Sequence, residues 1–238
     1  MSAQVRAELL KLRTVPATAL VLVACVVLGP LLAFLEALTS DQTTAADSRS
    51  VLTNAGISGL LILLYGVVSM TGEERHDTIA GTLLAVRDRR RVVVAKALAM
   101  ALCGLLAGAL SAIAVAAVAL PLLGDAPLED VGGLVLAFAG QLAYSALAGV
   151  IGVGLGALGR SQALTLVAVL VWLLAIEPTL GQFFDVVNRF GIEGSAAALA
   201  RAPQLGDLPQ GAALAVYVGW ALVALAAGSA VLRRRDVT

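Results

Sequence analysis

The sequence predicts an all-α, polytopic membrane protein with six transmembrane helices. The first observation is composition: of 238 residues, 60% are hydrophobic and 13% are charged, and the mean hydropathy is +0.95. A soluble domain carries about 25% charged residues, so a soluble fold of this length could not bury so much apolar surface. The second observation is that nearly charge-free apolar runs recur six times, each close to the ~20 residues that cross the hydrocarbon core as a helix.

These runs place the six spans at about residues 14–38, 50–71, 94–123, 131–158, 161–184 and 209–232. Each is expected to be helical because lipid offers no partner for a backbone polar group, which must be bonded within the segment. The fifth run reaches full length only if Glu177 and the stretch to Phe184 lie at its outer end.

The distribution of arginine and lysine predicts which side is cytoplasmic. The flank before the first span, the connection 73–96 and the chain end at 233–235 hold most basic residues, whereas the other side holds only Arg49, Arg189 and Arg201. Short loops rich in Lys and Arg stay inside the cell. We therefore expect a multi-pass protein of the cell membrane with both termini in the cytoplasm. The excess of arginine over lysine, with abundant Ala, Val and Leu, points to a bacterial source.

Residues 1–13 precede the first span and predict an interfacial elbow helix. Val5, Leu9 and Leu12 share one helical face, while the basic residues lie elsewhere, which is typical of a helix lying along the membrane surface. The alternative is that this segment is only the basic flank of the first span. The run continues past Cys25, which favours a retained span over a cleaved lipoprotein signal.

The connection 73–96 is expected to be structured. Asp77 can cap a short helix from Thr78 to about Val86, and Asp88 can cap the helix that becomes the third span. The apolar side chains of the short helix are those of Ile79, Leu83 and Leu84. Such a cluster predicts a contact surface for another protein or for the membrane face; the alternative is packing against the chain's own bundle.

Small residues in the third and fourth spans predict a compact bundle. Gly104 and Gly108 are four residues apart, and the fourth span carries Gly149, Gly152, Gly154, Gly156 and Gly159. Such spacing lets helix backbones approach closely where lipid gives no hydrophobic drive. It leaves open whether the contacts lie within one chain or between two.

The segment 185–208 is too interrupted to span the bilayer. Pro178, Pro203 and Pro209 bracket its phenylalanines and an alanine run. We expect one or two short re-entrant helices that dip into the outer leaflet, which requires protein to cover their backbone.

The chain offers little chemistry of its own. It contains no GxxxxGK[ST] phosphate loop, so it is not expected to hydrolyse ATP. Its only histidine, His76, falls in the cytoplasmic connection, and Cys25 and Cys103 fall in apolar runs that predict buried thiols. No catalytic residue, metal site or bound cofactor is therefore predicted. The net charge of +0 provides no field for nucleic acid.

A few polar side chains within or beside the spans are candidates for a substrate path: Asn54, Tyr65, Gln141, Tyr144 and Glu177. Carboxylates at membrane depth are costly. Glu36 and Glu177 lie near predicted outer ends, where they can reach water. The alternative for them is a function in substrate passage or in pairing with Arg189 or Arg201.

The layout of the chain resembles the type-2 ABC exporter permeases. The resemblance lies in the start Glu8-Leu9-Leu10-Lys11-Leu12-Arg13, the six spans, the interrupted outer segment and the loop that runs from Glu73-Glu74-Arg75-His76-Asp77-Thr78-Ile79-Ala80-Gly81-Thr82-Leu83-Leu84 to Arg87–Arg91 and Lys96. It covers essentially the whole chain, by layout more than by signature. The family usually has a glycine before the first threonine, where this chain has Asp77, and Gly81-Thr82 follows.

The resemblance implies a membrane subunit that pairs with a second copy or a homologue and docks separate ATPase subunits, which bind ATP and magnesium. By position, the docking residues would be Glu73, Glu74, Arg75, Asp77, Thr78, Ile79, Thr82, Leu83 and Leu84, and the elbow residues Glu8, Leu9, Lys11, Leu12 and Arg13. Two other classes stay open: an ATP-independent carrier or channel, and a membrane anchor or assembly protein. The substrate is not predicted.

Overall fold

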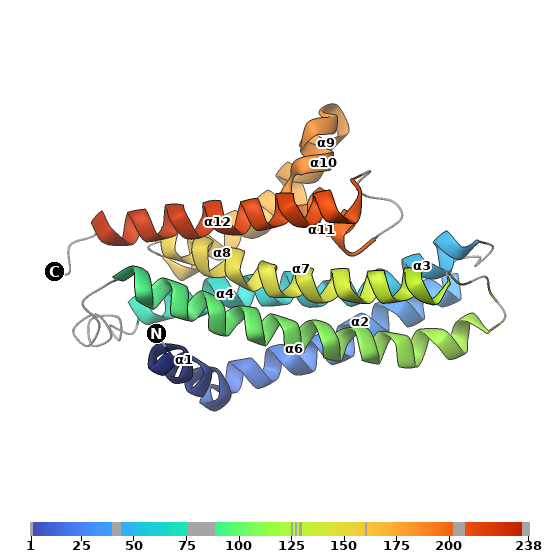
Figure 1. Ribbon diagram of the computed structural model, residues 1–238, viewed down its shortest axis with the longest axis horizontal. Coiled ribbons are helices and arrows are strands. Elements are labelled where there is room, and N and C mark those ends of the chain that lie inside the picture. Colours follow the sequence, from blue (N-terminus) through green and yellow to red (C-terminus); the bar gives the residue numbers. More distant parts are fainter. Residues whose placement is uncertain are drawn as a thin grey trace.

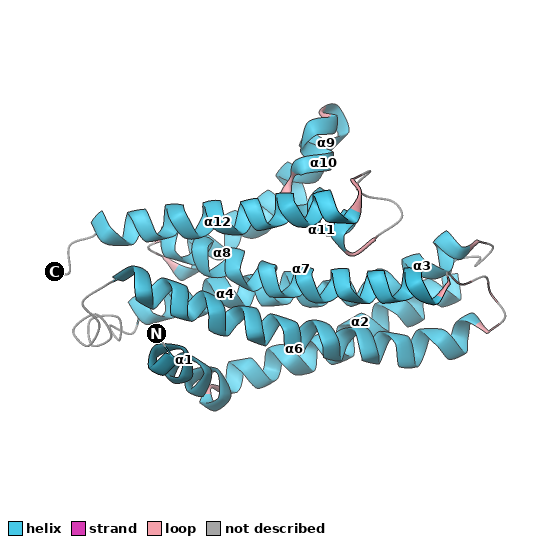
Figure 2. Ribbon diagram, in the orientation of Figure 1, coloured by secondary structure: helices cyan, strands magenta, loops and turns pink. Residues whose placement is uncertain are grey.

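The protein folds as a bundle of long helices, described here from a computed structural model. The structure describes residues 2–39, 44–75, 89–124, 126, 128, 130–159, 161–201 and 208–234. Within these ranges the secondary structure is helical, without a strand (Figure 2). Six helices are long and apolar enough to cross a membrane. The all-α class and the number of spans expected from the sequence are therefore confirmed.

The helices follow one another in a simple order. They are α1 (Ser2–Thr14), α2 (Pro16–Thr39), α3 (Ala45–Thr53), the 3-10 turn η1 (Asn54–Gly56), α4 (Ile57–Arg75), α6 (Arg89–Leu123), α7 (Val131–Leu158), α8 (Gln162–Val171), the π-helical turn η2 (Trp172–Ile176), α9 (Glu177–Phe183), α10 (Asp185–Phe190), α11 (Ile192–Leu199) and α12 (Gln210–Arg234). The six apolar spans are Pro16–Thr39, Ala45–Gly72, Arg91–Leu123, Val131–Leu158, Gln162–Phe183 and Gln210–Arg233.

Helix α7 lies at the centre of the bundle. It packs against α4, α6 and α12, while α2 packs against α6, and α8 reaches the bundle mainly through α4. Helix α1 and the end of α12 lie at the same end of the bundle, as an even number of spans requires (Figure 1). At the side, α9 and α10 project beyond α11.

Close backbone contacts at glycine bring the neighbours of α7 together within one chain. A Cβ atom on Gly152 would lie 2.0 Å from the carbonyl oxygen of Leu63 in α4, and one on Gly104 in α6 would lie 2.2 Å from the carbonyl oxygen of Ser145 in α7. On the side of α12, a Cβ on Gly154 would lie 2.5 Å from a backbone carbon of Ala224. The intrachain bundle thus uses the small residues whose partners the sequence left open.

The second span begins earlier than the apolar run does. Thr44 and Asp47 form a capping box, in which each side chain accepts a backbone hydrogen bond from the other residue. This cap lets the helix start at Ala45, although the sequence placed the span from residue 50. The helix is then interrupted by the 3-10 turn η1, where the carbonyl of Ala55 becomes available to side chains of other helices.

Many large apolar side chains face outward, as expected of a bundle surrounded by lipid. They are concentrated on α2, α6, α8 and the segment 183–190; examples are Leu20 at 69% exposure, Ile113 at 61%, Leu164 at 73% and Phe183 at 75%. Exposed apolar surface on this scale marks a membrane or protein contact rather than a water-facing surface.

Candidate functional site

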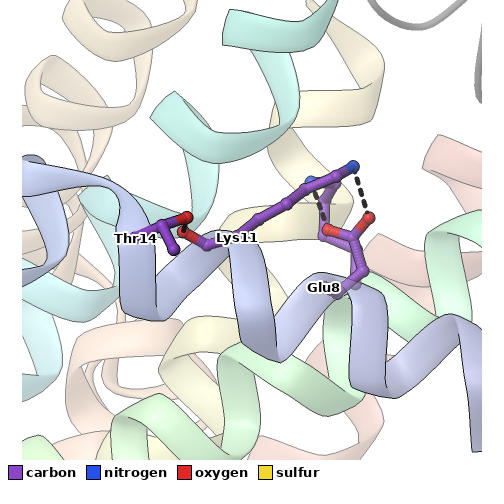
Figure 3. Close-up of polar contacts among 4 residues, drawn as sticks. Glu8, Lys11 and Thr14 are labelled. Atoms are coloured by element: carbon purple, nitrogen blue, oxygen red, sulfur yellow. Dashed lines mark hydrogen bonds and ion pairs between the residues drawn. The ribbon is translucent and has the colours of Figure 1, made fainter.

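Helix α1, the predicted elbow, is fixed to the third span by a buried ion pair. Glu8 Oε2 accepts a hydrogen bond from Lys96 Nζ at 2.8 Å, and both side chains are nearly inaccessible. Glu8 Oε1 accepts from Lys11 Nζ at 2.7 Å, one turn further along α1 (Figure 3). Lys96 lies near the start of α6. The carboxylate therefore joins α1 to the same helix that follows the predicted docking loop.

The two ammonium groups also set the ionisation of Glu8. Burial by itself raises the pKa of this carboxyl, but the charges and hydrogen bonds of Lys96 and Lys11 outweigh burial and hold the pKa below its usual value of 4.5. A carboxyl with a lowered pKa stabilises the fold above its ordinary pKa, and this stabilisation is lost as the pH falls through the lowered value. The Glu8 carboxyl is therefore ionised at neutral pH.

The other predicted elbow residues lie on different faces of α1. Leu12 packs against an apolar cluster to which α2, α4, α6, α7 and α12 contribute, and Leu9 is half-buried. Arg13 and Lys11 are exposed, and Leu10 is 62% exposed. The apolar exposed side chain and the basic residues suit a helix at the membrane surface, and its location there stays a prediction.

Most of the predicted docking loop falls outside the described residues. This applies to Asp77, Thr78, Ile79, Thr82, Leu83 and Leu84. Glu73, Glu74 and Arg75 form the last residues of α4. Helix α6 begins at Arg89, so the end of the predicted loop, including Lys96, belongs to this helix.

Gln141 stands at the centre of a buried polar network. Its Nε2 atom donates to the carbonyl oxygen of Ala55 and to the hydroxyl oxygens of Ser58 and Ser145, each at 3.0 Å. Ser111 of α6 donates to the same carbonyl at 3.2 Å. The network provides hydrogen bonds to the Ala55 carbonyl oxygen in η1 and joins α4, α6 and α7.

Asn54 begins the 3-10 turn η1 and is held there by hydrogen bonds to α2 and α3. Its Nδ2 atom donates to Glu36 Oε2 at 2.6 Å and to the carbonyl oxygen of Val51 at 3.0 Å. The other carboxylate oxygen of Glu36 accepts from the hydroxyl of Ser50. Glu36 thus joins α2 to α3, a pairing that the sequence did not predict.

The two tyrosines predicted for a substrate path pack between helices. The hydroxyl of Tyr65 in α4 lies 2.6 Å from that of Thr18 in α2. The ring of Tyr144 meets that of Tyr217 edge-on with centroids 5.7 Å apart, and it covers Gly59 of α4. Both side chains therefore hold neighbouring helices together.

Glu177 caps a helix instead of reaching water. It is 4% exposed, and its Oε1 atom accepts from the backbone N–H of Glu193 in the first turn of α11 at 2.6 Å. Its Oε2 atom accepts from the indole N–H of Trp172 at 3.1 Å. A carboxylate is favourable at a helix N-terminus because it meets free N–H groups and the positive end of the helix dipole.

Two of the cavities on the described part of the chain lie between the spans. One, of about 160 Å³, lies between the second, third and fourth spans; it is lined by Arg49, Leu52, Thr53, Ala55, Ala112, Ala116, Leu120, Leu134, Ala137, Phe138, Gln141 and Ala200. The other, of about 630 Å³, is an apolar groove between α7, α8 and α12 that ends at Trp172, Ile192 and Trp220. Of the five predicted path residues, only Gln141 lines either cavity.

Several functional residues escaped sequence reasoning because their partners are distant in the chain. Glu8 and Lys96 are 88 positions apart, and Ser58 and Ser145 are 87 apart. The detectable signal was polarity itself: a lysine, a glutamine or serines inside or beside an apolar run. Cys25 and Cys103 are free and buried, as expected. Among the described residues, no group of three or more His, Cys, Asp or Glu side chains is placed to hold a metal ion.

Comparison with known proteins adds no family to this geometry. No protein-family model matches the chain, and no curated protein gives a significant match. The structure and the sequence define the class as a multi-pass membrane protein with six spanning helices.

Proposed function

We propose that this chain is the membrane-spanning permease subunit of an ATP-binding cassette exporter in the cell membrane, and that separate ATPase subunits hydrolyse the ATP. The observation that carries the proposal is the buried contact between Glu8 of α1 and Lys96 of α6. It joins the elbow to the helix that follows the docking loop. A push on either element by a cytoplasmic partner would therefore reach the third span.

An ion pair of this kind can transmit movement between α1 and α6. A buried ion pair adds little net stability, since the desolvation cost offsets much of the attraction, but it fixes the relative position of two helices. Lys96 belongs to α6, which contacts α1, α2, α4 and α7. Movement of α6 would be passed to the centre of the bundle.

The layout of the bundle supports the same proposal. Helix α1, the end of α4 and the start of α6 lie at one end of the bundle together with the end of α12 (Figure 1). With the basic flanks of the sequence at this end, both termini would be cytoplasmic. The exposed apolar side chains of α8 and α10, such as Leu164 and Val186, offer a surface for a second copy or a homologue within the lipid bilayer.

The experiment begins with the ATPase that co-purifies with this chain and is identified by its phosphate-loop sequence. The two proteins are reconstituted together in vesicles, and ATP hydrolysis is measured with and without the permease. We expect the double variant Leu83→Asp/Leu84→Asp to lose at least about tenfold of the bound ATPase, because two charges enter an apolar contact. The matched control is Leu128→Asp in the connection between α6 and α7, at the opposite end, which should leave capture unchanged.

A second double variant tests whether the contact between Glu8 and Lys96 transmits movement. Glu8→Leu with Lys96→Met removes both charges together, so no uncompensated charge stays buried. We expect ATPase binding to persist while ATP-driven transport falls about tenfold.

Equal capture by the wild type and the Leu83→Asp/Leu84→Asp variant would contradict the docking surface. Flux driven by an ion gradient in vesicles that hold this chain alone would identify a carrier instead.

A further inference from the structure

Helices α9 and α10 form a lateral arm (residues 177–190) that is attached to the middle of the sixth span. The indole N–H of Trp220 donates to the carbonyl oxygen of Phe190, the last residue of α10, at 2.8 Å. Trp220 belongs to α12, which runs from Gln210 to Arg234. At 1.5 Å per residue, it lies about 15 Å from the start of this helix, which is half the thickness of the hydrocarbon core. The attachment of the lateral arm would therefore lie near the middle of the bilayer.

The lateral arm projects sideways and stays close to this depth. Figure 1 shows α9 and α10 pointing away from α12 rather than along it. Helix α10 is six residues long, so its first residue lies no more than about 8 Å from Phe190 along the helix axis. Both ends of α10 would therefore lie within the hydrocarbon region.

Apolar and charged side chains are exposed together on the lateral arm. Phe183, Phe184 and Val186 are each more than half exposed. Asp185 and Arg189, about one turn apart on α10, are also exposed. In the part of the chain that the structure describes, neither of these charged side chains has an ion pair or a hydrogen bond. Lipid offers a charge no partner, so charged side chains at this depth require contact with protein or water.

A second copy of the chain provides the missing partners by symmetry. A two-fold axis along the membrane normal brings together elements of equal depth and makes each patch contact its own counterpart. The axis also reverses the direction of the lateral arm within the membrane plane. Two arms packed side by side therefore run in opposite directions, and the acid of each arm meets the base of the other. Since the arm exposes one carboxylate and one guanidinium on α10, it is complementary to itself.

We infer that the lateral arms of two copies pack side by side inside the bilayer, with Asp185 of each copy paired with Arg189 of the other. A guanidinium and a carboxylate form strong charge-assisted hydrogen bonds, and the exposed phenylalanines supply the apolar part of the contact. The inference rests on the proposed function, in which the subunit works as a pair. It deepens that function by naming the partner and the residues that join the two copies.

The test is self-association of the full chain in lipid vesicles. Copies with donor or acceptor fluorophores on C-terminal tags are reconstituted together, and energy transfer is followed as the protein-to-lipid ratio is lowered. Asp185→Arg and Arg189→Asp each place like charges opposite one another in a pair of identical copies. Each variant alone should therefore associate at least about tenfold more weakly than the wild type.

A mixture of the two variants separates pairing between copies from pairing within one arm. Asp185→Arg copies and Arg189→Asp copies should associate with each other as the wild type does, because an acid again faces a base across the pair. Within each variant chain the two side chains have the same sign, so an ion pair inside one arm cannot explain the recovery. The recovery also shows that both variants fold.

Two further variants complete the test. Phe183→Ala should weaken association about tenfold, whereas Phe34→Ala, which removes an exposed ring from α2, should leave it unchanged. Each charge variant is first checked for insertion and for the unfolding temperature of the wild type. Arg189→Gln replaces a variant that fails this check, and it should also weaken association about tenfold because both ion pairs are lost.

Association that is unchanged by the charge variants would overturn the inference, as would a mixture that associates no better than either variant alone. Absence of energy transfer between wild-type copies would overturn it too. Because no ATPase is present, failed capture of an ATPase would contradict the proposed function and leave these results intact. Absence of pairing with intact ATPase capture would overturn this inference alone.

Discussion

The fourth and fifth spans are similarly apolar and yet differ in how much of each is buried inside the bundle. The mean hydropathy of their most apolar stretches is 1.9 for α7 and 2.1 for the span from Gln162 to Phe183, but 33% of the first stretch is buried inside the bundle and 17% of the second. Hydropathy therefore identifies both as spans and does not tell which one forms the core. In lipid, the outside of the bundle is as apolar as the inside.

Side-chain size is what separates the two spans. Helix α7 carries glycines that allow α4, α6 and α12 to approach its backbone, and it carries Gln141 in a buried network. The fifth span instead presents Leu164, Val167 and Leu174 outward, each more than half exposed. Its polar attachment is at one end, where Glu177 caps α11. Helix α7 thus packs closely against three helices of its own chain, whereas the fifth span leaves many of its large side chains exposed.

The largest expected effect comes from adding one methyl group to the centre of α7. Gly152→Ala would place a Cβ atom 2.0 Å from the carbonyl oxygen of Leu63, so α4 and α7 must separate. We expect a loss of about 3 kcal/mol, at the upper end for overpacking. The measurement is thermal unfolding of the detergent-solubilised protein, followed by size-exclusion chromatography.

The matched control lies in the fifth span. At Gly181 in α9, a Cβ atom would make an ordinary contact of 3.5 Å with Asn188. Gly181→Ala should therefore leave the unfolding temperature unchanged or raise it slightly, because alanine favours a helix over glycine by about 1 kcal/mol. Similar losses at both positions would show that the two spans are packed alike.

A smaller effect is expected from exchanging glutamine for leucine in the two spans. Gln141→Leu removes three hydrogen bonds from the network around Ala55. Two of them, to Ala55 and to Ser58, join different helices, and interhelical hydrogen bonds in membranes contribute about 0.6 kcal/mol each on average. We expect a loss of about 1 kcal/mol, since Ser111 still donates to the Ala55 carbonyl.

Gln182→Leu is the control for this exchange. Gln182 is exposed in α9, so the change should have no measurable effect on chemical unfolding. A loss at Gln182 as large as that at Gln141 would contradict the division between the two spans.

A further effect, on the pH dependence of stability, concerns the attachment of the fifth span to α11. Burial, and then the nearby charge of Glu177, raises the pKa of Glu193 from 4.5 to about 7. The folded state therefore keeps a proton that the unfolded chain releases above about 4.5, so stability should fall as the pH rises from about 4.5 to about 7 and then level off. The measurement is the unfolding temperature between pH 5 and pH 8.

Glu193→Gln should flatten this pH profile, because an amide does not titrate. Glu8 cannot cause the slope, since its pKa is lowered and its contribution changes only below about 4.5. An unchanged profile in the variant would show that Glu193 is ionised throughout and does not sense the cap.

The sequence predicted the helices at the end of the bundle that holds α1, but not the contacts between them. The pattern at residues 1–13 predicted a helix, and α1 covers Ser2–Thr14. Glu8, however, was assigned only to an interfacial elbow helix, while in the structure it is bound by Lys96 of the third span. No local pattern pairs residues 88 positions apart. The docking loop and the side of the membrane that it faces stay predictions.

The acidic residues near the spans show the same limit. Glu36 and Glu177 were expected near outer ends, where they would reach water, serve substrate passage or pair with Arg189 or Arg201. Each instead binds groups of its own chain: Ser50 and Asn54 in one case, and Glu193 and Trp172 in the other. A cost of burying charge is predictable from sequence, but the donors that offset the cost are assembled only in the fold.

By itself the sequence determined the number of spans and the helical class, because lipid requires a long apolar run with internally bonded backbone wherever the chain crosses. Only the tertiary structure decided which faces turn inward, that the glycines of α7 serve contacts within one chain, and that Glu8 pairs with Lys96. The physical reason is that lipid and protein interior are equally apolar, so partner choice depends on shape and on the few polar groups. Both are set by residues far apart in the chain.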